Sequence, residues 1–273
     1  MLSRTLALFA ALAALATPPA VPAAQAGTGL DVVSARLLPG WRQPDGTHLA
    51  GLELVLAQGW KTYWRAPGDA GIPPRFDWSG SDNLSGVAIS WPVPRVFDQN
   101  GMRSIVYADR VVLPLHVRPA RSGADVRISA RIDLGVCEDI CIPAQVSVAG
   151  VLPADARRPD PAIAVALAAR PLSAEEADVS AVTCVLAPAQ DGLGLRVEVE
   201  MPGARGVKAA VIETADPHVW VSEPALSAAA GRLAAESRLV HVDGNAFALD
   251  RDGVRVTLLD GASAVDIRGC GSR

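Results

Sequence analysis

The feature that most constrains the fold is a strict alternation of apolar and other residues along 126–136. The apolar positions are Val126, Ile128, Ala130, Ile132, Leu134 and Val136. Successive side chains of a strand point to opposite faces of a sheet, so this pattern predicts a strand with one buried face. The same alternation recurs along 193–201 and 254–258. We therefore expect a chain rich in β-strands.

Glycine turns divide the chain between these segments. The Asp-Gly and Asn-Gly pairs are Asp45-Gly46, Asn100-Gly101, Asp191-Gly192, Asp243-Gly244, Asp252-Gly253 and Asp260-Gly261. Both residues of such a pair tolerate a positive φ, which tight hairpins need. Many short strands with turns of this kind favour sandwiches or barrels.

Residues 153–172 break the strand pattern. Their first part, Arg157-Arg158-Pro159-Asp160-Pro161, is typical of a linker, and the alanine-rich stretch 162–170 predicts about two turns of helix ending before Pro171. We place a domain boundary here, with β-sandwiches at 27–152 and 173–273.

The first 26 residues resemble an export signal. Arg4 is the only charged side chain before an apolar run at 6–16, and Ala24-Gln25-Ala26 is a small-x-small cleavage site. The apolar run is shorter than the roughly 20 residues of a bilayer-spanning helix. We expect a mature chain that starts at Gly27, is not inserted in the membrane and lies in the periplasm; a retained anchor is the alternative.

The charge of the chain argues against two classes of partner. The formal net charge is -4, and neither sign forms a long run. Nucleic acid or an anionic membrane surface would favour a basic patch, so neither is expected as a partner.

Four cysteines allow three pairings. Pairing Cys137 with Cys141, and Cys184 with Cys270, keeps both bonds within the predicted domains. On the chain-entropy model, closing the longer loop stabilises the fold by about 4–5 kcal/mol and the shorter by about 2 kcal/mol. We therefore interpret Cys184–Cys270 as structural and assign Cys137 and Cys141 a redox or metal-binding role. Outside the cytosol such bonds persist.

The surroundings of the Cys137-x-x-x-Cys141 pair support this division. Strand parity places Cys137 on the face opposite the apolar series, and Pro143 is expected to limit the following strand. Glu138 and Asp139 put negative charge beside the thiols and disfavour the thiolate. Such a pair suits attack by a partner rather than spontaneous reactivity.

Several separated motifs resemble one family. They are 59–74 (GWKTYWRAPGDAGIPP), Trp91-Pro92, 107–114 and 136–143 (VCEDICIP). The stretch from Asp31 to Leu152 is similar to the amino-terminal periplasmic domain of the DsbD/ScsB thiol:disulfide interchange (protein-disulfide reductase) family, most closely its ScsB branch, named for suppression of copper sensitivity. The motifs at 219–224 and 266–270 resemble the second module of such proteins.

The resemblance implies an immunoglobulin-like domain whose cysteine pair receives electrons and passes them to periplasmic substrate proteins. Cys137 and Cys141 match that pair, which would make them the catalytic residues of a protein-disulfide reductase, with no cofactor. We thus expect an all-β fold with two immunoglobulin-like sandwiches joined by a linker that contains a short helix.

Two departures shape the expected partners. Full-length members carry a membrane electron-transporting domain and a thioredoxin-like domain, and this sequence has no Cys-x-x-Cys motif. We expect a thioredoxin-like periplasmic protein and a membrane electron donor that act in trans. The spacing of Cys137 and Cys141 is also shorter than in DsbD itself.

Other candidate sites are weaker. Trp60, Tyr63 and Trp64 are a possible cap or docking surface, or they pack a loop onto the sandwich. The histidines, which are His48, His116, His218 and His241, are scattered along the chain.

Three function classes remain open. The first is a thiol–disulfide relay. The second is a periplasmic Cu(I)-handling protein with a role in copper tolerance, since two thiolates suit a soft ion, although no histidine is near the pair in sequence. The third is a binding or scaffold module whose disulfides are only structural.

Overall fold

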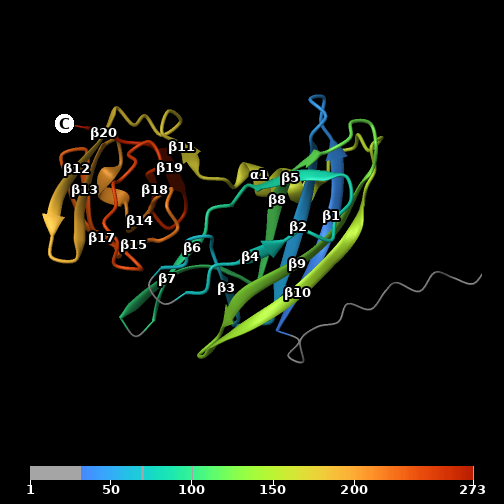
Figure 1. The fold of residues 1–273 in the computed structure, drawn as a ribbon, viewed down its shortest axis with the longest axis horizontal. Helices are drawn as coiled ribbons and strands as arrows, with labels where there is room; N and C mark the ends of the chain where they lie inside the picture. The colour runs from blue at the N-terminus through green and yellow to red at the C-terminus, as the bar shows by residue number, and fades with distance from the viewer. Residues whose placement is uncertain (1–31, 69–70, 100, 273) are drawn as a thin grey trace, which may run out of the picture.

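The structure, a computed structural model, describes residues 32–68, 71–99 and 101–272. It is nearly all-β, as predicted (Figure 1). Two sheets use strands between residues 33 and 152, and two others use strands between 172 and 272. We call these parts the first and the second half. The predicted export signal, 1–26, lies outside the described residues.

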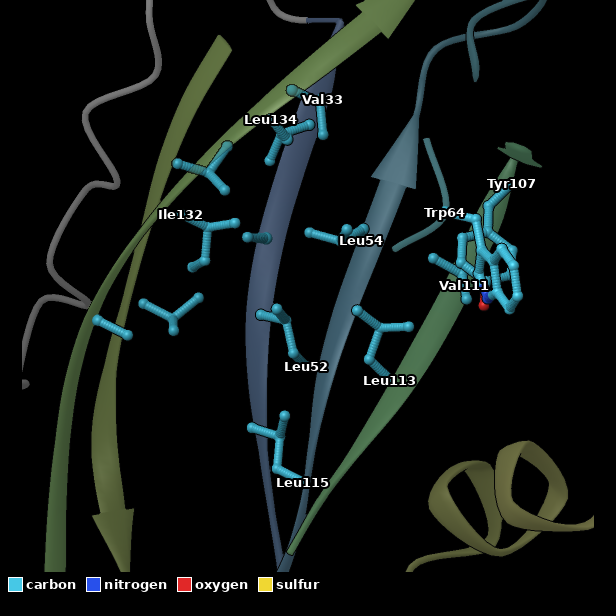
Figure 2. Packing of buried hydrophobic residues seen from close by; sticks show 14 of the residues in the cluster. Val33, Leu52, Leu54, Trp64, Tyr107, Val111, Leu113, Leu115, Ile132 and Leu134 are labelled. Carbon is cyan, nitrogen blue, oxygen red and sulfur yellow. The ribbon is translucent and has the colours of Figure 1, made fainter. Parts of the chain in front are cut away.

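The first half is a sandwich of two antiparallel sheets. One sheet has the order β1-β2-β8-β5, formed by Val33–Arg42, His48–Leu56, Arg110–Pro119 and Leu84–Ile89. The other has the order β10-β9-β3-β7-β6, formed by Cys141–Leu152, Val126–Cys137, Lys61–Tyr63, Met102–Ala108 and Arg95–Gln99, and β4 (Arg75–Asp77) also pairs with β9. The core between them contains Leu52, Leu54, Leu113, Leu115, Ile132, Leu134, Trp64 and Tyr107 (Figure 2).

Strand β9 shows the predicted alternation and then departs from it. Its apolar residues are buried from Val126 onward and its intervening residues are exposed as far as Asp133, but its last four residues are all buried. The second face of the strand is therefore covered at its carboxyl end, where Gly135 and Cys137 lie.

The expectation that Pro143 limits the next strand is wrong. Strand β10 runs unbroken from Cys141 to Leu152, with Pro143 opposite Gly135. Strand β10 lies at the edge of its sheet, so no strand pairs with its outer side. A proline whose nitrogen faces that side removes no hydrogen bond between strands.

The second half repeats the sandwich architecture. One sheet has the order β11-β19-β18-β14, formed by Leu172–Ser173, Ala264–Arg268, Arg255–Leu259 and Ala209–Glu213. The other has the order β15-β17-β13-β12-β20, formed by Val219–Val221, Arg232–His241, Gly192–Glu200, Ala181–Ala189 and Gly271–Ser272, with β16 (Ala225–Ala229) also on β17. Leu195, Val197, Ile212, Val256 and Ile267 are among the residues of its core.

Helix α1 (Pro161–Ala168) lies between the two halves in sequence. Asp160 caps it, since its carboxylate accepts hydrogen bonds from the amides of Ala162 (2.8 Å) and Ile163 (3.3 Å). Ile163 is fully buried against β1, β2 and β8, so the helix covers the outer face of that sheet. The part of the chain that the structure describes has no helix long and apolar enough to cross a membrane.

Candidate redox site

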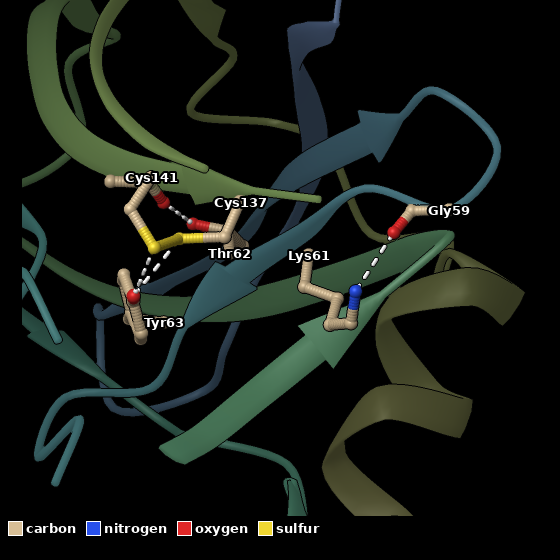
Figure 3. The surroundings of a disulfide bond; sticks show 7 residues. Gly59, Lys61, Thr62, Tyr63, Cys137 and Cys141 are labelled. Carbon is tan, nitrogen blue, oxygen red and sulfur yellow. Dashed lines mark hydrogen bonds between the residues drawn. A yellow bond between two sulfur atoms is a disulfide. The ribbon is translucent and has the colours of Figure 1, made fainter. Parts of the chain in front are cut away.

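The hairpin of β9 and β10 brings Cys137 and Cys141 together. They are direct partners in the strand register, their Cα atoms are 4.2 Å apart, and they are joined by a disulfide (Figure 3). Glu138, Asp139 and Ile140 form the turn, and the Ile140 side chain is 75% exposed. The pair thus sits at the end of a sheet, beside an apolar residue that projects into solvent.

The two sulfur atoms differ in their access to solvent. Cys137 is 8% exposed and belongs to a small apolar cluster with Tyr63 and Val106, against which Phe97 packs. Cys141 is exposed. An incoming thiol can therefore reach Cys141 more readily than Cys137.

The hydroxyl of Tyr63 contacts both sulfur atoms. Its oxygen is 2.9 Å from Sγ of Cys137 and 3.0 Å from Sγ of Cys141 (Figure 3). A disulfide has no hydrogen to donate, so the tyrosine is the donor in both contacts. Burial raises the pKa of Tyr63, which keeps its hydroxyl protonated.

Short pairings and two glycines hold Tyr63 in place. Strand β3 pairs with β9 through Lys61 and Thr62, and the Thr62 hydroxyl donates a 2.9 Å hydrogen bond to the carbonyl of Gly135. A Cβ atom at Gly135 would lie 2.9 Å from Cδ2 and Cε2 of the Tyr63 ring, and one at Gly71 would lie 2.8 and 2.9 Å from Cδ1 and Cε1. Glycine at both positions therefore lets the ring lie beside the disulfide.

Lys61 lies next to this cluster. Its ammonium group donates a 2.9 Å hydrogen bond to the carbonyl of Gly59 (Figure 3). The same group is 4.4 Å from the centre of the Phe97 ring. It therefore brings a positive charge to the strand that carries Tyr63.

The three aromatic residues considered as a cap lie in different environments. Tyr63 contacts the disulfide, Trp60 is half-buried, and Trp64 is fully buried in the core of the first half. They do not form one continuous surface, because Trp64 has no exposed area.

The second disulfide lies in a different setting. Cys184 on β12 is bonded to Cys270, which lies between β19 and β20. The two residues are 86 positions apart in sequence, and their Cα atoms are 5.5 Å apart. Both residues are buried in the core of the second half, with exposed fractions of 1% and 8%.

The histidines lie on separate elements. His48 (β2) is fully buried, and its Nε2 donates to the carbonyl of Pro39 at 2.6 Å; burial lowers its pKa, while that hydrogen bond acts in the opposite direction. His116 contacts Ser90, and the rings of His218 and His241 stack with their centroids 5.8 Å apart. Within the described ranges, no group of three or more His, Cys, Asp or Glu side chains is arranged to hold a metal ion.

Comparison with known proteins gives a family match within the first half. Residues 34–153 match the family model described as "Thiol:disulfide interchange protein DsbD, N-terminal". Over these residues the first half is similar to a DsbD amino-terminal domain. This confirms the resemblance predicted from the sequence, and Cys137, Cys141 and Tyr63 all lie within the matched residues.

The fold of the described chain also has a counterpart among solved structures. The crystal structure of the N-terminal periplasmic domain of ScsB from Proteus mirabilis superimposes with a TM-score of 0.61 at 23% identity, over 91% of this chain and 100% of that one. No curated protein sequence matches the chain. The likeness in fold extends over both halves.

Proposed function

We propose that the chain is a periplasmic thiol–disulfide interchange protein that relays electrons through Cys137 and Cys141. The observation that carries the proposal is the disulfide at the hairpin end, with one sulfur exposed and both sulfurs hydrogen-bonded to a buried tyrosine hydroxyl. The match to the DsbD amino-terminal family supports the same reaction class. The chain would act as an enzyme of the protein-disulfide reductase type, with a thioredoxin-like partner and a membrane electron donor acting in trans.

Exchange begins at the exposed sulfur. A thiolate of a reduced thioredoxin-like partner attacks Sγ of Cys141 and forms a mixed disulfide, while the bond to Cys137 breaks and Cys137 leaves as a thiolate. The Tyr63 hydroxyl, which is 2.9 Å from that sulfur, donates a hydrogen bond to the departing anion.

The second step completes the transfer of two electrons. The second thiolate of the partner then attacks the partner's other sulfur atom, which is bonded to Cys141 in the mixed disulfide. The partner becomes oxidised, and Cys141 leaves as a thiolate. Cys137 and Cys141 are then both reduced, and the reverse sequence delivers the electrons to an oxidised substrate protein.

Single-cysteine variants test the assignment of Cys141 as the attacked residue. In Cys137→Ser the remaining thiol is exposed, and in Cys141→Ser it is buried. Each variant is mixed with a thioredoxin whose attacking cysteine carries a 5-thio-2-nitrobenzoate group. Attack forms the protein–protein disulfide and releases the coloured thiolate, so absorbance reports the rate.

We expect Cys137→Ser to react at least about tenfold faster than Cys141→Ser, because access to the thiol limits the rate. Unfolded in urea, the two variants should react at similar rates, which attributes the difference to the fold. Equal rates in the folded proteins, or a faster Cys141→Ser variant, would contradict the assignment.

A Cu(I) titration separates the relay from the two alternative functions, copper handling and a scaffold role. The reduced wild-type chain is titrated with Cu(I) in the presence of a competing chelator. Tight Cu(I) binding without thioredoxin exchange would favour copper handling, and neither activity would favour a scaffold. Exchange at Cys141 supports the relay.

A further inference from the structure

The sheet of β14, β18 and β19 has two buried faces. One face belongs to the core of the second half and includes Ala210, Ile212, Val256, Leu258, Val265 and Ile267. The alternate residues Ala209, Leu259 and Ala264 belong to the core cluster of the first half, and Val211 packs against that cluster. We call this second face, with Glu213, Thr257 and Asp266, the junction face. It docks the second half onto the first, beside β6 and β7 (Figure 1).

Arg65 binds the polar part of the junction face. Its Nε is 3.2 Å from both carboxylate oxygens of Glu213, and its Nη2 donates to Glu213 (2.9 Å) and to the hydroxyl of Thr257 (3.0 Å). Asp266 lies 3.8 Å from the same Nη2 and is held by two hydrogen bonds from Arg255. The Arg65 side chain is only 10% exposed, so these contacts are largely shielded from water.

Arg65 is also fixed on the side of the first half. Its guanidinium lies 3.7 Å from the ring centre of the buried Trp64. The amide of Trp64 donates a 2.9 Å hydrogen bond to the carbonyl of Ile105 on β7. Arg65 is therefore clamped between a core tryptophan and the second half.

A second ion pair reaches the adjacent strand. Arg103 on β7 contacts Glu223 of the second half at 2.7 Å. The last three residues of β7 pair with the three residues of β3, and one of them, Val106, belongs to the cluster around Cys137. The segment that carries Tyr63 and the adjacent strand β7 are thus both attached to the second half, within three residues of the paired Tyr63 and Val106.

We propose that the second half is a positioning element for the disulfide, and that Arg65 is the residue through which it acts. Strand β3 is only three residues long, and it pairs with β9 at two positions and with β7 at three. Its carboxyl end continues through the buried Trp64 to Arg65. Arg65, two residues beyond Tyr63, ties that end to the junction face. The Tyr63 hydroxyl is thereby kept within hydrogen-bond distance of both sulfur atoms. This inference rests on the proposed exchange activity.

A double-mutant cycle tests it, with the rate at which a reduced thioredoxin reduces Cys137–Cys141 as the readout. Arg65→Gln should slow the reaction by about threefold to tenfold, which is the usual range for a residue that acts through another. If Arg65 acts through the Tyr63 hydroxyl, the same substitution in a Tyr63→Phe background should change the rate by less than about twofold.

Arg110→Gln is the matched control. Arg110 is an arginine of the first half paired with Glu53, which keeps Arg36 as a second partner, so the rate should stay at the wild-type value. If Arg65→Gln does not fold, Glu213→Gln enters the same cycle, since it removes the charge of the partner and keeps the shape of the side chain.

The inference is overturned if the effect of Arg65→Gln is below twofold, or if it is equally large with and without the tyrosine hydroxyl. A wild-type chain that does not exchange at all would instead overturn the proposed function. The two failures are therefore distinguishable.

Discussion

The two disulfides of this chain are the same bond in opposite surroundings. Cys137–Cys141 closes a hairpin at the end of a sheet, exposes one sulfur and accepts hydrogen bonds from Tyr63. Cys184–Cys270 spans 86 positions and is buried in the core of the second half. The first bond closes a short loop of the unfolded chain, and a partner protein can reach it. The second bond closes a long loop of the unfolded chain and is shielded from solvent and from partner proteins.

The contrast indicates how one type of covalent bond can have two different roles in the same chain. Stabilisation grows with the length of the loop that is closed, and exchange requires access to a sulfur atom. Each disulfide here has one of these properties and lacks the other. The following measurements either sharpen this division or break it.

The largest effect is expected on stability. Replacing both Cys184 and Cys270 with alanine should lower the free energy of unfolding by about 4–5 kcal/mol, while the same change at Cys137 and Cys141 should lower it by only about 2 kcal/mol. Urea unfolding followed by circular dichroism measures both. If the hairpin pair proved the more stabilising, the division of roles would be wrong.

The next effect concerns the rate of exchange. Tyr63→Phe removes the donor to the departing Cys137 thiolate, and a hydrogen bond to a charged group contributes about 1.5–3 kcal/mol. The reduction of Cys137–Cys141 by a thioredoxin should therefore slow by about tenfold to a hundredfold in this variant.

Tyr107→Phe is the control for that variant. Tyr107 is a buried tyrosine on the neighbouring strand β7, and its hydroxyl donates to the carbonyl of Pro92 at 2.7 Å instead of to a sulfur. It should lower stability and leave the exchange rate unchanged. Equal slowing by the two variants would mean that packing, and not the sulfur contact, explains the result.

The smallest effect depends on pH. Burial lowers the pKa of His48, so below the ordinary value of 6.5 the unfolded chain binds a proton that the folded chain does not. Stability should fall as the pH drops through 6.5, by at most about 1.4 kcal/mol per pH unit. His48→Gln keeps a donor for Pro39 and should flatten this dependence between pH 7.5 and 5.5.

His48→Gln also separates stability from redox behaviour. The residue lies on β2, in the other sheet of the first half from the Cys137–Cys141 hairpin. At pH 7.5 the variant should have the same Cys137–Cys141 reduction potential as the wild type. The same pH slope in both proteins would contradict the assignment to His48.

Much of the fold follows from local patterns in the sequence. The alternation at 126–136 corresponds to β9, the one at 193–201 to β13, and the alanine-rich stretch to α1. The two strands follow from the period of apolar residues, and the helix follows from its composition and the proline after it. Both signals lie within a single segment of the sequence.

The site could be predicted only in part. Cys137 and Cys141 are only four positions apart in sequence, but the role of Tyr63 depends on a contact across 74 positions that no periodicity reveals. Gly135 is a signal for it, because a glycine within an alternating strand often marks the close approach of another group. The junction face was missed since its alternation also fits a solvent-exposed strand.

The most direct test of the account is a single redox titration of both disulfides. The oxidised chain is equilibrated in buffers of defined potential, alkylated and mapped by mass spectrometry, so that each pair gives its own midpoint. The account predicts that Cys137–Cys141 becomes reduced at a potential above about -300 mV, while Cys184–Cys270 stays oxidised there. A Cys137–Cys141 bond that resists reduction as strongly as Cys184–Cys270 would contradict the relay.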